Sequence, residues 1–191
     1  MNSLFITAAS LVSEADVRAA RLGSRFGRLD LASQLALLAV EKLAADFDGL
    51  GRERVGICLT AAAGSLSTDA AYWNGRAGVG GPSPTLFAYT LPSAAIGEIA
   101  IRHRLMGPNL CFVGHESDAL SEAAHLILRG EAAACLAVFC HVVTPALAAM
   151  IQWSPAARAG ALLLQRLDTG LHRWRENDRD IAAMCSLLSA R

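Results

Sequence analysis

The stretch from Leu91 to Arg129 holds the residues of this sequence that are best placed to do chemistry. Its pattern predicts a helix, a Gly-Pro turn, a short strand, a tight turn and a second helix, in LPSAAIGEIAIRHRLMGPNLCFVGHESDALSEAAHLILR. A strand that turns sharply into a helix places the turn residue at the helix N-terminus, where unpaired N–H groups and the helix dipole favour an anion or a thiolate. The sequence therefore predicts a nucleophile position at this turn, which holds His115 and Glu116.

Glu116 has a chemical and a structural interpretation, and the sequence leaves both open. A desolvated carboxylate can act as a general base, with His115 as a weak candidate for its partner, because adjacent turn residues usually point apart. A carboxylate in a first helical turn also stabilises the helix by roughly 0.3–1 kcal/mol, and Ser117 or Asp118 could supply the cap instead. Cys111 lies in the predicted strand, where a free cysteine is typically a small buried hydrophobe.

The other candidates for a cofactor or metal site do not have the required spacing. The segment Gly75–Gly81 matches neither a GxGxxG turn after a strand nor a GxxxxGK[ST] phosphate loop. The five cysteines include no CxxC pair and do not combine with the five histidines in a zinc pattern. We therefore expect no cofactor and no bound metal.

Strand-like and helical patterns alternate along the chain, which indicates an α/β layered fold. Strands are predicted at Leu4–Ala8, Val55–Thr60, Asn109–Val113, Ala133–Val143 and Ala159–Leu167. Helices are predicted at Asp30–Ala45, Pro92–His103, Ser117–Arg129 and from about Asn177–Asp180 onward. The almost continuous apolar run Ala133–Val143 is typical of a strand covered on both faces. The Gly- and Pro-rich segment Asn74–Thr85 predicts a long surface excursion.

The composition limits the class of protein. The chain has 191 residues, of which 53% are hydrophobic and 18% charged, and its formal net charge is +0. This length is typical of one domain of roughly 100–200 residues, so we expect a single domain over residues 1–191. The high apolar fraction excludes a disordered chain. Without an excess of positive charge, nucleic-acid binding is not expected.

The apolar excess indicates either a membrane protein or a protein that covers apolar surface with a partner. Globular domains have about 45–50% apolar and about 25% charged residues. The longest apolar runs, such as Ala132–Cys140, are shorter than the roughly 18–20 residues of a spanning helix. Met1–Ser10 lacks the basic start of a signal peptide. We therefore expect a cytoplasmic protein with no membrane span and with an apolar partner surface.

Several segments, in the same order, resemble the β-ketoacyl synthase family of the thiolase superfamily. They are Arg25–Ala45, Arg54–Asp69, Ser83–Gly107, Gly107–Gly130 and Ala157–Trp174. The fourth resembles the unit of Gly-Pro, strand, turn and helix that carries the active-site cysteine of the family. The resemblance implies half of a thiolase-like fold, with a mixed, mostly parallel sheet covered by helices on both faces.

The sequence departs from the family at the residues that perform the condensation. Counted from Gly107-Pro108, the position of the active-site cysteine holds Glu116, and a carboxylate cannot form the thioester of this mechanism. The family's two catalytic histidines and its lysine come from a second, homologous half, which we expect this chain to lack. His141 and His172 cannot be matched to those histidines. No catalytic residue of the condensing reaction is therefore expected.

The resemblance also implies which residues face a partner or its acyl tunnel. In the family, the helix before the Gly-Pro turn and the strand after it lie near the dimer interface. The residues expected there are Ala94, Ala95, Gly97 and Glu98 of the helix and Asn109, Leu110, Cys111, Phe112 and Val113 of the strand. The strand would pair antiparallel with its counterpart across a pseudo-twofold axis. Close packing of small helix residues within the chain itself is the alternative, because spacing alone does not separate the two.

Three hypotheses for the function follow. The first is a non-catalytic, chain-length-factor-like subunit that pairs with an active ketosynthase in type II fatty-acid or polyketide synthesis, with an aryl-polyene-like pathway as one case and acyl carrier protein as a further partner. The second is an acyl-thioester decarboxylase or hydrolase that uses Glu116 as general base. The third is a homodimeric acyl-binding or scaffold protein.

Overall fold

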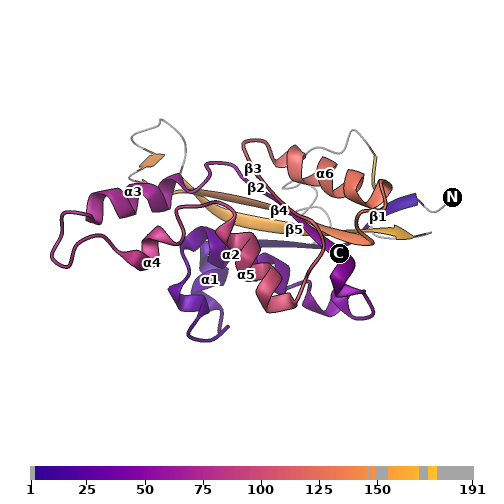
Figure 1. Cartoon of the computed structure of the whole chain (residues 1–191), viewed down its shortest axis with the longest axis horizontal. Helices are drawn as coiled ribbons and strands as arrows, with labels where there is room; N and C mark the ends of the chain where they lie inside the picture. Colours follow the sequence, from indigo (N-terminus) through magenta and orange to yellow (C-terminus); the bar gives the residue numbers. More distant parts are fainter. Residues whose placement is uncertain (1–2, 146, 149–154, 168–171, 176–191) are drawn as a thin grey trace.

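A six-stranded sheet with the order β3-β2-β4-β5-β1-β6 forms the centre of the structure (Figure 1). This computed structural model describes residues 3–145, 147–148, 155–167 and 172–175. The strands are β1 (Ser3–Ser13), β2 (Val55–Ala61), β3 (Asn109–Val113), β4 (Ala134–Val143), β5 (Ala156–Leu167) and β6 (His172–Arg173). All five strands that the sequence predicts are present, and the predicted strand before the turn coincides with β3.

The sheet is mixed, as predicted, but its antiparallel share is larger than expected. β2 pairs in parallel with β3 and β4, whereas the pairings β4–β5, β5–β1 and β1–β6 are antiparallel. The long apolar strands β4 and β5 are buried because helices cover both faces of the sheet. The apolar pattern of these strands is the same in either direction, so it could not reveal the antiparallel pairing.

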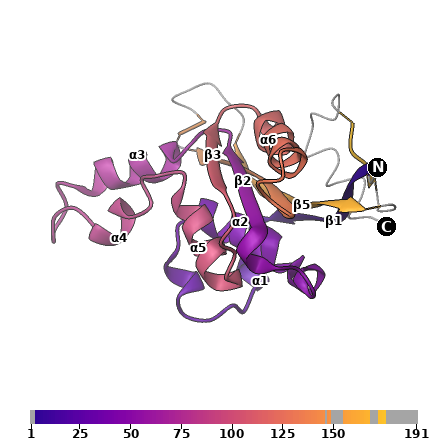
Figure 2. The same cartoon turned by 45° about the vertical axis from the view of Figure 1, so that its right-hand side comes forward.

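Helices cover the two faces of the sheet unequally (Figures 1 and 2). The helix α6 (Glu116–Leu128) lies on one face, and α1 (Glu14–Ala19), α2 (Leu31–Glu41) and α5 (Ala94–His103) lie on the other. Each face has its own core. The larger core contains the buried sides of α2 and α5, and the smaller core contains the buried side of α6. The three helices predicted within the described residues are thus confirmed as α2, α5 and α6.

A bulge in β1 lets one strand contribute to both cores. The register of β1 against β5 shifts between Ile6 and Ala8. Ile6 lies in the core on the α6 side, whereas Ala8 lies in the core on the α2 side. Ser10, beyond the bulge, donates from its hydroxyl to the carbonyl of Ala39 in α2 at 2.6 Å. A bulge inserts one unpaired residue and so reverses the face to which the later side chains point.

Short helices and an excursion complete the described chain. The single-turn 3₁₀ segments are Phe26–Arg28, Ala44–Phe47 and Arg52–Arg54. The predicted excursion lies between α3 (Leu66–Gly75) and α4 (Pro84–Phe87), and the two helices project together from one end of the sheet as an arm (Figures 1 and 2). The helix predicted from about Asn177–Asp180 lies outside the described residues.

Candidate functional site

β3 lies at an edge of the sheet and leads into the turn where the sequence predicts chemistry. Among the described strands it pairs only with β2. Its side chains alternate between the two faces: Cys111 packs against the larger core and Phe112 against the smaller one. Asn109, Leu110 and Val113 are exposed. The strand therefore presents both apolar side chains and an unpaired backbone edge to its surroundings.

Two hydrogen bonds fix which backbone groups of β3 point outward. The amide of Ile57 donates to the carbonyl of Pro108 at 2.8 Å. The amide of Gly114 donates to the carbonyl of Ala61, the last residue of β2, at 3.4 Å. In a parallel ladder, alternate residues of one strand bond to the same neighbour, so the even-numbered residues face β2. The residues whose N–H and C=O groups point away from the sheet are therefore Asn109, Cys111 and Val113.

The turn between β3 and α6 is made by Gly114 and His115. Gly114 has a φ of +132°, which an L-residue with a side chain rarely adopts. His115 is the N-cap residue of α6, with extended backbone and an exposed side chain that makes no capping hydrogen bond. Glu116 is the first helical residue of α6. The structure thus confirms a tight strand–turn–helix unit with Glu116 at the helix N-terminus.

A side chain from β2 forms a hydrogen bond with the first turn of α6. The buried hydroxyl of Thr60 accepts a hydrogen bond from the amide of Ala119 at 3.2 Å. The sequence left Glu116, Ser117 and Asp118 open as capping residues. This partner of the turn comes from a strand far away in the sequence, and no local pattern could reveal it.

The thiol nearest in sequence to the turn is not activated. Burial raises the pKa of the Cys111 thiol, which favours its uncharged form at neutral pH. Cys58, Cys135 and Cys140 are buried and free. Burial raises the pKa of Cys140 far above the usual range. A reactive cysteine needs an electropositive, partly exposed environment, so these thiols behave as small core residues, as the sequence predicts; the fifth cysteine, Cys185, lies outside the described residues.

The four residues of α5 that were expected to face a partner have different surroundings. Ala95 is only 4% exposed and packs in the larger core. Glu98 is held within the chain, because Arg25 donates to both of its carboxylate oxygens at 3.1 and 3.2 Å. Gly97 is exposed and Ala94 half-buried. The burial of Ala95 is what core packing predicts, whereas contacts of these four residues with a partner stay a prediction. The ion pair of Glu98 with Arg25 joins α5 to the loop before α2.

His103, at the end of α5, is a buried titratable group away from the turn. Its ring packs edge-on against Phe47, with 5.4 Å between the centroids. Its Nε2 atom lies 3.4 Å from a carboxylate oxygen of Glu41, which Arg102 also binds at 2.6 Å. Burial lowers the pKa of His103; the carboxylate of Glu41 opposes this shift, and the guanidinium groups of Arg102 and Arg52 add to it.

The lowered pKa of His103 predicts that acid destabilises the fold. The unfolded chain, with an ordinary histidine pKa of about 6.5, binds the proton more readily than the folded chain. Stability from neutral His103 is therefore complete above about pH 6.5 and decreases as the pH falls below it. Urea unfolding at pH 7.5 and 5.5 should show this decrease in the wild type and a smaller one in His103→Gln. Equal decreases in the two proteins would contradict the prediction.

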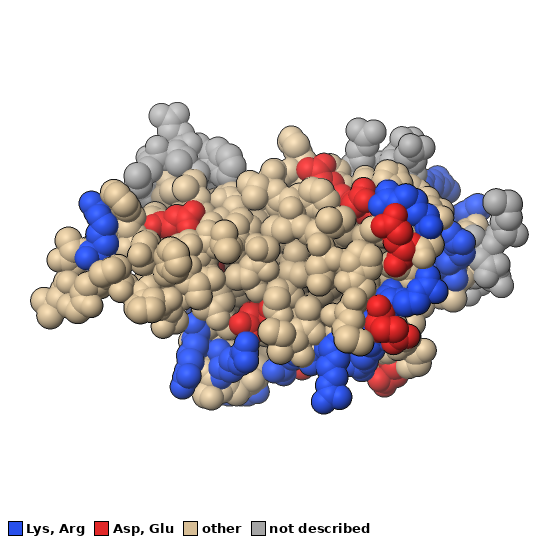
Figure 3. Space-filling view, viewed as in Figure 1, with Lys and Arg blue, Asp and Glu red and all other residues tan. Residues whose placement is uncertain are grey.

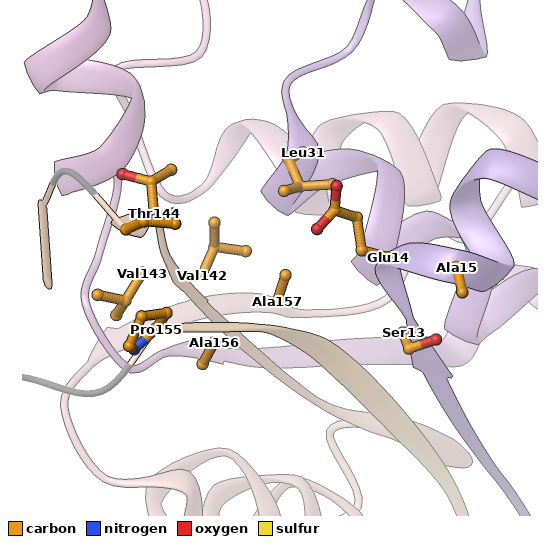
Figure 4. A pocket seen from close by; sticks show the side chains of 11 residues that line it. Ser13, Glu14, Ala15, Leu31, Val142, Val143, Thr144, Pro155, Ala156 and Ala157 are labelled. Atoms are coloured by element: carbon orange, nitrogen blue, oxygen red, sulfur yellow. The ribbon is translucent and has the colours of Figure 1, made fainter.

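A shallow hollow of about 490 Å³ lies where β1 meets α1 and where β4 ends. Figure 4 shows its wall, which consists mainly of aliphatic side chains such as Leu31, Val142 and Ala157. The charged group in this wall is Glu14, and Arg18 binds its carboxylate at 2.6 Å. Two hydroxyl groups, of Ser13 and Thr144, are the other side-chain polar groups of the wall.

The described part of the chain contains neither a cluster of metal-ligating side chains nor a membrane-spanning helix. There, no group of three or more His, Cys, Asp or Glu side chains could hold a metal ion. No helix in the described ranges has both the length and the apolar character needed to cross a bilayer.

Comparison with known proteins places this geometry in a known fold. No protein-family model and no curated protein matches the sequence. Among solved structures, the ishigamide ketosynthase/chain length factor is similar over 89% of this chain, with a TM-score of 0.71 and 22% identity. The ketosynthase ApeO in complex with its chain length factor ApeC, from Xenorhabdus doucetiae, is similar over 87% of the chain, with a TM-score of 0.68 and 18% identity. A third is the complex AntDE:AntF, a type II PKS acyl-carrier protein with its ketosynthase, at a TM-score of 0.69, 17% identity and 87% coverage.

The chain has the thiolase-like fold of ketosynthases and chain length factors. It spans 64%, 80% and 63% of the three matched chains, respectively. The fold that the resemblance implied is therefore confirmed.

Because the chain has a ketosynthase fold, the residues in the turn between β3 and α6 bear on its chemistry. The count from Gly107-Pro108 predicts that Glu116 occupies the family's cysteine position, and the structure places Glu116 at the start of α6. A thiolate at a helix N-terminus would have a lowered pKa. This chain has a carboxylate at that point and a histidine beside it, and its nearby strand thiol is uncharged.

The sequence missed one feature of this ketosynthase fold, the apolar arm formed by α3 and α4. The arm carries a hollow of about 650 Å³, lined mainly by Leu66, Tyr72, Trp73, Phe87 and Leu147. Trp73 and Phe87 are each 61% exposed. The signal was available in the two aromatic residues beside a Gly- and Pro-rich segment, but they form no periodic stripe, so the pattern predicted only a loop.

Proposed function

We propose that this chain is a non-catalytic, chain-length-factor-like subunit that pairs with an active ketosynthase in type II fatty-acid or polyketide synthesis. One observation carries the proposal: the turn where the fold would stabilise a thiolate holds His115 and Glu116, and the neighbouring thiol of Cys111 is half-buried with a raised pKa. A carboxylate cannot accept an acyl group as a stable thioester. The nucleophile for condensation would therefore come from the partner.

The similar structures support a partner of the same fold. Their names describe ketosynthases with chain length factors, and in one case an acyl-carrier protein with its ketosynthase. The exposed edge of β3 supplies a surface on which such a partner could extend the sheet. Acyl carrier protein would be a further, transient partner, and an aryl-polyene-like product is the finer part of the proposal. With its described cysteines free, the pair would work in the reducing cytosol.

Complex formation between this chain and a ketosynthase tests the proposed pairing directly. The chain is co-expressed with a ketosynthase from the same genome, and the mixture is run on size-exclusion chromatography with light scattering at micromolar concentration. A one-to-one complex is expected. Separate elution of the two chains would contradict the proposal, and a stable homodimer without affinity for the ketosynthase would favour the scaffold hypothesis.

Replacing Glu116 by alanine separates the proposed subunit from an enzyme that uses this carboxylate. In the pair, condensation should change less than about twofold, because the partner supplies the chemistry. A general base contributes about 10²–10⁴-fold, so the competing hypothesis predicts a loss of that size in malonyl- or acyl-thioester turnover by the purified chain alone. Turnover by the chain alone that is lost in Glu116→Ala and in Glu116→Gln would contradict the proposal.

A further inference from the structure

The strand β1 has a long edge of its own, which other strands cover only in part. β1 has eleven residues, and among the described strands β6 pairs with it only at Phe5 and Ile6. Beyond Ile6, β1 pairs with β5 alone within the described part of the sheet. The free edge of a strand presents unpaired N–H and C=O groups, to which another chain can add a strand. The rest of this edge is therefore a place where copies of the chain could associate.

Hydrogen bonds show which backbone groups point out of the β1 edge. The amide of Trp174, which follows β6, donates to the carbonyl of Leu4 at 2.9 Å, so Leu4 faces that edge. Outward residues alternate along an antiparallel strand, and the bulge in β1 shifts this alternation from even to odd residues. Beyond the bulge, the outward residues are therefore Ala9, Leu11 and Ser13.

An ion pair takes up the outward groups at the carboxyl end of β1. The ammonium of Lys42, at the end of α2, donates to the carbonyl of Leu11 at 3.4 Å and to the carboxylate of Asp16 at 3.3 Å. This carboxylate, in α1, accepts hydrogen bonds from the amide and the hydroxyl of Ser13, each at 2.8 Å. The carbonyl of Leu11 and the amide of Ser13 are thus bonded within the chain.

These contacts leave too little of the edge for a further strand. In an antiparallel pair, each outward residue exchanges both its N–H and its C=O with one residue of the neighbouring strand. β6 covers the edge up to Ile6, and the ion pair bonds to Leu11 and Ser13. Between these two closures, Ala9 is the one outward residue to which no described residue bonds.

The two charged groups suit this role. Hydrogen bonds from Ser13 and the nearby ammonium of Lys42 hold the pKa of Asp16 below its usual range, so the carboxylate is charged at neutral pH. The cationic side chains in Figure 3 lie mainly along the lower edge and at the right-hand end of the molecule. The 17 Lys and Arg residues include a single lysine, Lys42. Its compact ammonium has three donors and can bond to a carbonyl and a carboxylate at once.

We infer that Lys42 and Asp16 close the edge of β1 against strand addition by a second copy of this chain. A second copy fits this edge, because the outward groups of one β1 are complementary to those of another that runs antiparallel to it. Lysine is a common means of protecting strand edges in this way. The inference does not depend on the proposed function, because it concerns the isolated chain.

Light scattering of the isolated full chain over a range of micromolar concentrations tests the closure. Lys42→Met/Asp16→Ala removes both charged groups and leaves the net charge unchanged. This variant should form larger species than the wild type, at concentrations at least about tenfold lower, because backbone groups on each copy become available for hydrogen bonds. Adding Ala9→Pro removes the N–H at the middle of the edge and should restore the mass of the wild type. Proline is tolerated where the missing N–H faces outward.

Glu14→Ala/Arg18→Met is the matched control. It removes a carboxylate and a cation from the same helix α1, where the two groups bind each other at 2.6 Å, and it leaves the edge closed. Exposed ion pairs contribute little to stability, so self-association of the control should stay within about twofold of the wild type. Thermal unfolding shows which variants have folded. Where the double test variant has not, Lys42→Met alone is measured, because it keeps the bonds between Ser13 and Asp16.

Three results would overturn the inference. The test variant could keep the mass of the wild type at every concentration, or the control could associate as strongly as the test variant. Association could also persist after Ala9→Pro is added, which would place the contact elsewhere on the molecule. Binding to a ketosynthase does not enter these measurements, so the proposed function is tested separately.

Discussion

Replacing Gly107 by alanine is expected to destabilise the fold by about 3 kcal/mol or more. A Cβ atom at this position would lie 2.5 Å from the carbonyl carbon and oxygen of Val55 and 2.8 Å from the amide nitrogen of Gly56. These are backbone atoms of β2, which pairs on both sides and is buried along its whole length. Overpacking usually costs about 1–3 kcal/mol, and a clash with central backbone lies at or beyond the upper end of that range.

The expected damage from Gly107→Ala includes the candidate site. The amide of Gly107 donates to the carbonyl of Val55 at 3.1 Å, and Pro108 then starts the contact of β3 with β2. Moving Gly107 away from β2 would therefore displace the strand that carries the exposed edge. Urea unfolding of the isolated chain measures the loss of stability directly.

Gly97 provides a matched control for this substitution. It lies within α5, it is exposed, and a Cβ atom there would meet nothing within 4 Å. Alanine is favoured over glycine inside a helix by about 0.5–1 kcal/mol, so Gly97→Ala should stabilise the isolated chain by about that amount. Destabilisation by both substitutions to the same degree would contradict the assignment of the Gly107 effect to the clash.

The sequence predicted the elements whose burial is periodic or continuous. α5 buries Ile96, Ile99 and His103 at helical spacing, and β4 is apolar along nearly all of its length, so both were identified from the pattern. Strand direction was not predictable in this way, because apolar runs are equally compatible with parallel and antiparallel neighbours. The bulge after Ile6 was hidden for the same reason: burial continues at alternate residues although the covered face changes.

The candidate site was predictable in position but not in detail. Gly107-Pro108 and Gly114 mark the ends of β3, so the turn and Glu116 could be located from the sequence. The contact of Thr60 with α6 and the ion pair of Glu98 depend on residues far away in the chain. Neither contact has a local signal, and only the three-dimensional arrangement shows them.

The proposed pairing through β3 can be tested at a single backbone group. The N–H of Val113 points away from the sheet, and its side chain is 64% exposed. Proline at this position would remove the outward donor while keeping the hydrogen bonds between β3 and β2. Proline is tolerated at edge strands where the missing N–H faces outward, and the extended residue before it suits the restriction that proline imposes. The chain's own fold should therefore survive.

In the pair, Val113→Pro should weaken binding by about 5- to 150-fold. A carbonyl of the antiparallel partner strand would lose the N–H of Val113 as its donor. Leaving this carbonyl buried and unsatisfied costs about 1–3 kcal/mol. Val113→Thr is the control, because it keeps both the N–H group and the shape of the side chain, and its Kd should stay close to that of the wild type. Titration of each variant against the ketosynthase measures the Kd, and unfolding of the isolated chains checks the fold.

The outcome distinguishes a continuous sheet from a contact made by side chains alone. If Val113→Pro binds as tightly as the wild type, the two chains do not share a sheet through β3. If Val113→Thr weakens binding as much as Val113→Pro, the side chain rather than the backbone carries the contact. If only Val113→Pro weakens binding, the missing backbone N–H explains the loss of affinity. Val113→Thr keeps this N–H group and nearly the same side-chain shape.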